Sequence, residues 1–249
     1  MMFLLMSGVI IVYTLRVNMS VAAPKMTEDL NWSESQKGYV LSAFYWGYAA
    51  GQIPFSRLAQ VILSLRIVQF LNFSSSCNFY IFQIYGAKHL FGFSVIVPSI
   101  LSMLVPIACK ESYPVALFIR AILGFCESAS FPCVFHFFPR WIPTAEKTSM
   151  IATVFSGMYV GEIIGFSLSG VLVDSVIIAN GQDIGGWPSV FYVFGIVGIL
   201  WYPYWTYMAY ETPEEHPYME KEELLLIRQG IDAIIFFVNC VVCDSIVCT

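Results

Sequence analysis

Long apolar stretches recur at nearly regular intervals along the chain, separated by shorter polar segments. Six of these stretches are mostly apolar, and each holds about 20 residues, the length that a helix needs to cross the hydrocarbon core of a bilayer. They run Phe3–Ala23, Gly38–Leu58, Leu90–Cys109, Pro114–Phe138, Ser149–Val173 and Ser189–Ala209. Glycine and proline occur inside them, as membrane helices tolerate. The pattern therefore predicts an all-α membrane protein, a bundle of six transmembrane helices.

The composition agrees with a membrane protein and excludes several other classes. Of 249 residues, 58% are hydrophobic and 12% are charged, whereas soluble domains carry about 25% charged residues. The net charge of −5 leaves no basic surface for a nucleic acid. The sequence also shows no nucleophile set, metal-ligand set or phosphate-binding loop. We expect a multi-pass protein of the plasma membrane or an endomembrane that is not an enzyme and needs no cofactor or metal.

The lysine and arginine residues predict the orientation of the chain. With the N-terminus inside, seven of them fall in inner segments, three in outer segments and two within spans. Cytoplasmic loops of membrane proteins carry an excess of positive charge, so we place the N-terminus in the cytoplasm. The inner residues are Arg57, Arg66, Lys88, Arg140, Lys147, Lys221 and Arg228.

Four ionisable residues lie within the predicted spans: Arg16, Arg120, Glu127 and Glu162. A charge at this depth costs at least about 2.5–3.5 kcal/mol, so it needs a partner, a water-filled cavity or a function. Arg16 follows Phe3 by 13 residues, which puts it about 20 Å into the membrane. We expect Arg16 and Asn18 to face a polar cavity and bind an anionic substrate, because a planar guanidinium pairs well with carboxylate or phosphate.

The other three ionisable residues are candidates for proton coupling. Arg120 and Glu127 share one face of span four because they are seven residues apart. At about 10.5 Å along the axis, they are too distant to neutralise each other. A carboxyl group in a dehydrated cavity can carry a proton through a transport cycle, which makes Glu127 the main candidate. For both residues the alternative is a structural ion pair with another helix, and Glu162 is either a second coupling acid or a polar packing contact.

Small residues recur at intervals of four in two of the spans. They are Gly157, Gly161 and Gly165 in span five, and Gly47 and Gly51 in span two. This spacing lets two helix backbones approach closely. We predict that these glycines serve bundle packing rather than transport directly.

Several motifs in a fixed order resemble the anion:cation symporters of the major facilitator superfamily. That family includes sialin, the vesicular glutamate transporters, the type I sodium–phosphate cotransporters and the plastid phosphate transporters. The motifs are RVNMSVA at 16–22, WSESQKGYVLSAFYWGY at 32–48, QIP at 52–54, Arg120, GFCE at 124–127, FP at 131–132, WIPTAE at 141–146, LSG at 168–170, WPSVFY at 187–192 and ETP at 211–213.

The resemblance implies that the chain is the N-terminal half of a transporter with two six-helix halves that works by alternating access. It implies that Arg16 contacts the anion, that Glu127 takes part in proton coupling and that Arg120 is tied to the cavity. The expected substrate is a small organic or inorganic anion that moves with H⁺ or Na⁺, and the C-terminal half is the expected packing partner. Leu41 stands where the glutamate transporters have a histidine, which argues against vesicular glutamate transport.

Two segments depart from the family pattern. The family's loop between spans two and three is short, but 61–83 adds 23 mostly apolar residues there. We interpret 61–83 as a non-native insertion, namely a translated retained intron, and the alternative is a genuine lineage-specific insertion. After the six-helix half at 1–209, 210–230 resembles the start of the central cytoplasmic loop, and 231–249 is interpreted as an aberrant or truncated tail. The alternative function is therefore a half-transporter or gene-model fragment that does not transport and has an interaction role or none.

Overall fold

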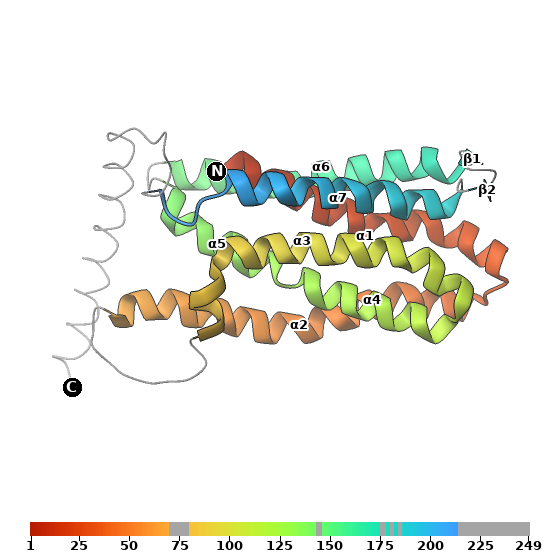
Figure 1. Cartoon of the computed structure of the whole chain (residues 1–249), viewed down its shortest axis with the longest axis horizontal. Helices are drawn as coiled ribbons and strands as arrows, with labels where there is room; N and C mark the ends of the chain where they lie inside the picture. The colour runs from red at the N-terminus through yellow and green to blue at the C-terminus, as the bar shows by residue number, and fades with distance from the viewer. Residues whose placement is uncertain (70–79, 143–145, 175–177, 180–181, 184–185, 214–249) are drawn as a thin grey trace.

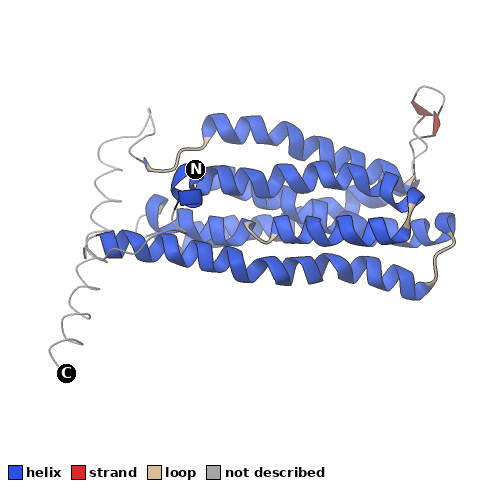
Figure 2. Ribbon diagram, turned by 60° about the horizontal axis from the view of Figure 1, so that its bottom comes forward, coloured by secondary structure: helices blue, strands red, loops and turns tan. Residues whose placement is uncertain are grey.

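A computed structural model describes residues 1–69, 80–142, 146–174, 178–179, 182–183 and 186–213. Its helices lie side by side along one long axis and form an elongated bundle (Figures 1 and 2). The helices are α1 (Met2–Leu30), α2 (Glu34–Gln69), α3 (Tyr80–Glu111), α4 (Tyr113–Glu127), α5 (Ser130–Trp141), α6 (Lys147–Asp174) and α7 (Trp187–Met208). Two short strands, β1 (Ile178–Ala179) and β2 (Gln182–Asp183), pair antiparallel between α6 and α7.

The predicted all-α bundle of six spans is confirmed. Each predicted span lies on one helix, except that span four is divided into α4 and α5. In the described part of the chain, four helical segments are long and apolar enough to cross a membrane: Met2–Leu30, Gly86–Glu111, Tyr113–Trp141 and Lys147–Asp174. The last turns of α7 are rich in aromatic residues, which are typical of a membrane interface.

The helix boundaries differ from the predicted ones for local reasons. Helix α1 continues through Pro24 and ends at Asn31, whose backbone is left-handed (φ 52°, ψ 41°) and whose N–H donates to the carbonyl of Thr27. Asparagine tolerates this conformation better than most residues do. The break between α4 and α5 lies at Ser128 and Ala129, because Pro132 has no N–H for the carbonyl four residues earlier and clashes with it.

Helices α2 and α3 continue into the segment that the sequence suggested is an insertion. Residues 61–69 belong to α2 and 80–83 belong to α3, whereas 70–79 lie outside the described residues. Of the predicted cytoplasmic loop at 210–230, residues 214–230 lie outside them, and so does the whole predicted tail at 231–249. The structure therefore leaves the interpretation of both segments a hypothesis.

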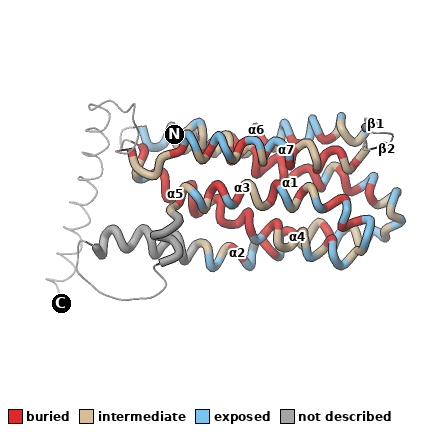
Figure 3. The backbone as a smooth tube through the Cα atoms, in the orientation of Figure 1, coloured by how far each residue is buried: buried red, intermediate tan, exposed pale blue. Residues whose placement is uncertain are grey.

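The predicted glycine packing is confirmed in both spans. A Cβ atom on Gly161 would lie 2.6 Å from the carbonyl oxygen of Ile10, so α6 and α1 touch backbone to backbone. A Cβ atom on Gly47 would overlap the carbonyl oxygen of Ala121, which brings α2 equally close to α4. Buried and exposed positions alternate along the helices (Figure 3). These two contacts set the positions of α1 relative to α6 and of α4 relative to α2. Helices α1 and α4 carry Arg16, Arg120 and Glu127.

Replacing Gly161 with valine is expected to destabilise the bundle, because the added side chain would meet backbone atoms that cannot yield. Overpacking of a core costs about 1–3 kcal/mol, and a clash with backbone lies at the upper end. The melting temperature of the detergent-solubilised chain, followed by size-exclusion chromatography, measures this. Gly170→Val on the same helix is the matched control, since nothing lies within 4 Å of a Cβ atom there. Equal melting temperatures for the two variants would contradict the packing role.

Glu211 joins three helices at the end of the bundle where α5 and α7 finish. Its carboxylate accepts a hydrogen bond from the backbone N–H of Ala87 (3.3 Å) and lies 3.6 Å from a guanidinium nitrogen of Arg140. The indole N–H of Trp141 donates to its backbone carbonyl (3.3 Å). Gly86 has a left-handed φ of 64°, where α3 bends. The Glu211 contacts therefore hold the start of the long part of α3 against the ends of α5 and α7.

Candidate functional site

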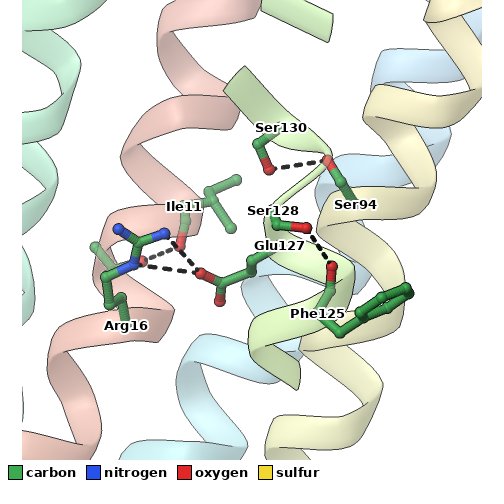
Figure 4. Close-up of polar contacts among 8 residues, drawn as sticks. Ile11, Arg16, Ser94, Phe125, Glu127, Ser128 and Ser130 are labelled. Carbon is green, nitrogen blue, oxygen red and sulfur yellow. Dashed lines mark hydrogen bonds and ion pairs between the residues drawn. The ribbon is translucent and has the colours of Figure 1, made fainter. Parts of the chain in front are cut away.

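Two of the residues that the sequence singles out meet in the interior of the bundle. The Nε and Nη2 atoms of Arg16 donate to one carboxylate oxygen of Glu127 at 3.4 and 3.3 Å (Figure 4). The Glu127 side chain is completely buried, and that of Arg16 is 16% exposed. The pair joins α1 to the last residue of α4, next to the break at Ser128. Glu127 therefore has an ion-pair partner on another helix, and that partner is the predicted anion-binding residue.

Three aromatic rings surround the guanidinium of Arg16. The centroids of Tyr13, Phe44 and Tyr48 lie 4.9, 5.1 and 4.8 Å from its central carbon. A cation this close to a ring is attracted by the electrons of its face. The faces of the rings accept none of the in-plane hydrogen bonds of the guanidinium, although the side chain of Tyr48 also hydrogen-bonds Arg16. The sequence analysis missed these rings, although Tyr13 is three residues before Arg16 and the other two lie in the motif at 32–48.

Arg120 is a second buried cation close to this group. Its central carbon lies 5.5 Å from the Phe44 ring, which thus contacts both arginines. Its Nε and Nη1 atoms have no hydrogen-bond partner among the described residues, and neither does the second carboxylate oxygen of Glu127. The structure pairs Glu127 with Arg16 and not with Arg120, as the spacing along span four predicts. A buried charge without a partner is costly, so Arg120 is suited to an anion that enters the bundle.

Asn18, which we expected to face one cavity with Arg16, lies two residues after it on α1. Consecutive positions of an α-helix differ by about 100°, so residues two apart point to different faces. Asn18 is completely buried, whereas Arg16 is partly exposed. Within the described residues, the amide group of Asn18 has no hydrogen-bond partner.

Glu162 lies beside this group rather than in it. It is half-buried on α6, next to Gly161, which packs on Tyr13. Glu162 interacts electrostatically with Tyr13, one of the three rings around Arg16. In the described part of the chain no ion pair involves Glu162. Both interpretations of this residue, a second coupling acid and a polar packing contact, are compatible with that position.

The described residues contain no group of three His, Cys, Asp or Glu side chains that could hold a metal ion. The chemistry of the interior is instead that of two arginines and one glutamate, enclosed by aromatic rings. Such a set can hold an anion and exchange it against a carboxylate.

Residues 5–242 match the Major Facilitator Superfamily. The chain belongs to this superfamily. It is therefore an integral, multi-pass membrane protein of a transporter family. It is similar to a bacterial homologue of the human lysosomal transporter Spinster in an inward-facing, occupied conformation, with a TM-score of 0.67 and 18% identity over 89% of this chain and 46% of that one. This similarity concerns the fold, and it agrees with half of a facilitator bundle.

Curated relatives of this superfamily member confirm the resemblance to anion transporters. The chain is 32% identical to the chloroplastic ascorbate transporter of Arabidopsis thaliana over 215 residues, which are 86% of this chain and 34% of the relative. It is 29% identical to vesicular glutamate transporter 1 of Xenopus laevis over 93% of this chain and 37% of the relative. It is 32% identical to probable anion transporter 4, chloroplastic, of Oryza sativa subsp. japonica over 86% of this chain and 31% of the relative. The chain spans about a third of the length of these relatives.

Proposed function

We propose that this chain is the N-terminal half of a secondary active transporter that moves a small organic or inorganic anion together with H⁺ or Na⁺ by alternating access. The observation that carries the proposal is the buried Arg16–Glu127 pair inside its ring of aromatic side chains. The similarity of the chain to proteins named as transporters of ascorbate, glutamate or anions supports the proposal as well.

In this proposal the anion and Glu127 compete for the same edge of Arg16. A proton that binds the Glu127 carboxylate removes its negative charge, and the charge-assisted bonds to Arg16 weaken. The anion then takes the place of the carboxylate on the guanidinium. When the anion leaves, Glu127 releases its proton and pairs with Arg16 again. Proton binding and anion binding favour each other in this scheme, which is the coupling that a symporter needs.

Arg120 contributes a second positive charge in the proposed cavity. Its Nε and Nη1 atoms, which lack partners among the described residues, can donate to an anion that has reached the bundle interior. The Phe44 ring, which contacts both guanidinium groups, keeps the two cations apart while no anion lies between them. We assign Arg120 to the cavity and to coupling, as the resemblance implies.

The C-terminal half of the full-length protein is the partner we propose for this chain. Large apolar side chains on α2 and α6 are exposed, among them Trp46 (77%), Tyr159 (68%) and Ile163 (65%). In an alternating-access cycle two halves rock against each other, so half of a cavity alone does not transport. The second candidate function is a half-transporter with an interaction role.

Transcript sequencing and an uptake assay together test the proposal. Sequencing across the codons for 60–84 and beyond 230 shows whether 61–83 is removed and whether a second half follows. We expect the longer product, in liposomes, to accumulate radiolabelled phosphate, ascorbate or glutamate when a pH or Na⁺ gradient is applied. The 249-residue chain is the matched control and should not accumulate them. No uptake of these anions by the longer product, or equal uptake by the short one, would contradict the proposal.

A further inference from the structure

Helices α1 and α6 touch along a regular register. Each step of four residues on α6 is matched by a step of four residues on α1. The contacts are those of Gly157 with Met6, Gly161 with Ile10 and Gly165 with Thr14, where added Cβ atoms would lie 3.0, 2.6 and 3.3 Å from backbone atoms of α1. Two helices that interdigitate their four-residue ridges continue in this way. The next step places Ser169 on α6 opposite Asn18 on α1.

Ser169 and Asn18 share a second property. Both residues are completely buried. Neither the Ser169 hydroxyl nor the two polar atoms of the Asn18 amide has a hydrogen-bond partner within the described residues. Buried polar groups are almost always hydrogen-bonded, and lipid offers no water to replace a missing partner. Two unsatisfied groups that the register brings to one level are therefore natural partners.

The two groups do not bond to each other in the structure. We propose that rotation of the Asn18 and Ser169 side chains forms a hydrogen bond between them across the contact between α1 and α6, and that this bond fixes the height of α1 in the bundle. Each group can donate and accept, so the pair can satisfy itself. Polar side chains of this kind hold membrane helices together when small residues let the backbones approach. The proposed pair follows directly after the Gly165 contact along the two helices.

The pair has a consequence for the charged site, and this part rests on the proposed function. Arg16 is two residues from Asn18 on the same rigid helix, and it reaches Glu127 at 3.3 Å. A slide of α1 by a single residue would move Arg16 by about 1.5 Å and break that contact. Asn18 is therefore a positioning residue for Arg16 rather than a contact of the anion.

Cysteine cross-linking tests the proximity. The seven native cysteines are replaced by serine or alanine, and Asn18→Cys is combined with Ser169→Cys in the detergent-solubilised chain. We expect oxidation to form a disulfide in this pair. Asn18→Cys with Gly170→Cys is the matched control and should not cross-link, because position 170 is next to the pair but faces open space. No cross-link at 169, or equal cross-linking at 170, would overturn the proposal.

A set of variants of the 249-residue chain tests the positioning role. We expect Asn18→Ala and Ser169→Ala each to lower the melting temperature. The double variant should melt no lower than the single ones, because each substitution removes the same bond. The exchange of Asn18→Ser with Ser169→Asn should recover at least half of the loss. Ser169→Ala hardly changes the packing but removes the proposed bond, so Arg16 would already be displaced from Glu127. Adding Glu127→Gln to Ser169→Ala should therefore lower the melting temperature by less than half as much as Glu127→Gln does in the unchanged chain. Additive losses, or a full Glu127→Gln effect, would overturn the positioning role. None of these readouts requires transport, so failure of the proposed function is scored separately.

Discussion

Arg16→Lys is expected to weaken gradient-driven uptake by the proposed full-length transporter about ten- to a hundredfold at low anion concentration, even though the positive charge is kept. A guanidinium offers a planar fork of donors to an anion, whereas an ammonium is a point charge on a flexible stem. The rings of Tyr13, Phe44 and Tyr48 are arranged around a flat group. Loss of a charged hydrogen bond of about 1.5–3 kcal/mol corresponds to a decrease of about ten- to a hundredfold in anion affinity. Uptake of the radiolabelled anion into liposomes measures the loss.

Removing Arg16 altogether has a second effect that must be separated from transport. Arg16→Ala leaves the Glu127 carboxylate buried without its ion-pair partner, and breaking a buried pair in this way costs about 3–5 kcal/mol. We expect Arg16→Ala combined with Glu127→Gln to melt close to the unchanged chain and still to take up no anion. Lys37→Ala is a matched control, because its ion pair with Glu34 lies on an exposed helix turn and contributes little. Normal uptake by Arg16→Lys, with normal expression, would remove Arg16 from the anion site.

The helices could be predicted from the sequence because the bilayer fixes their length. Five of the six apolar stretches correspond to one helix each, and the fourth corresponds to α4 and α5. The break between these two helices, which we did not predict, is explained by Pro132. The boundaries were less predictable. Nothing in hydropathy marks the end of α1 at Asn31, which depends on a left-handed cap eight residues beyond the apolar stretch Phe3–Ala23.

The charged site was predictable in its members but not in its pairings. The cost of charge in lipid identifies Arg16, Arg120 and Glu127 without any structure. That Glu127 pairs with Arg16, 111 residues away, depends on how α1 and α4 pack, which spacing along one helix does not contain. Asn18 is a different case. The depth of Arg16 in the membrane suggested a polar cavity shared with Asn18, but residues two apart on a helix point to different faces, so this part of the site stays a prediction.

Glu127→Gln is expected to remove the response of uptake to a pH gradient while anion binding is kept. Glutamine has the shape of glutamate and can still accept a hydrogen bond from Arg16, but it cannot bind and release a proton. A gradient of one pH unit supplies about 1.4 kcal/mol per proton, which is about a tenfold accumulation of a monoanion. The unchanged transporter should approach that value, and Glu127→Gln should equilibrate its substrate without accumulating it.

Two assays together decide whether Glu127 couples protons to transport or only pairs with Arg16: exchange of anion across the membrane, and net accumulation of anion. Counterflow of labelled against unlabelled anion needs only binding and alternation, so it should persist in Glu127→Gln, whereas accumulation that a protonophore abolishes should disappear. Glu162→Gln, on α6, resolves the two interpretations of that residue: a weaker pH response marks a second coupling acid, and an unchanged one marks a packing contact. If Glu127→Gln still accumulates anion along the pH gradient, the carboxylate serves only as the structural partner of Arg16. If a Na⁺ gradient drives accumulation equally in the unchanged transporter and in Glu127→Gln, the coupling ion is Na⁺ rather than a proton, because coupling then persists without the group that would carry the proton.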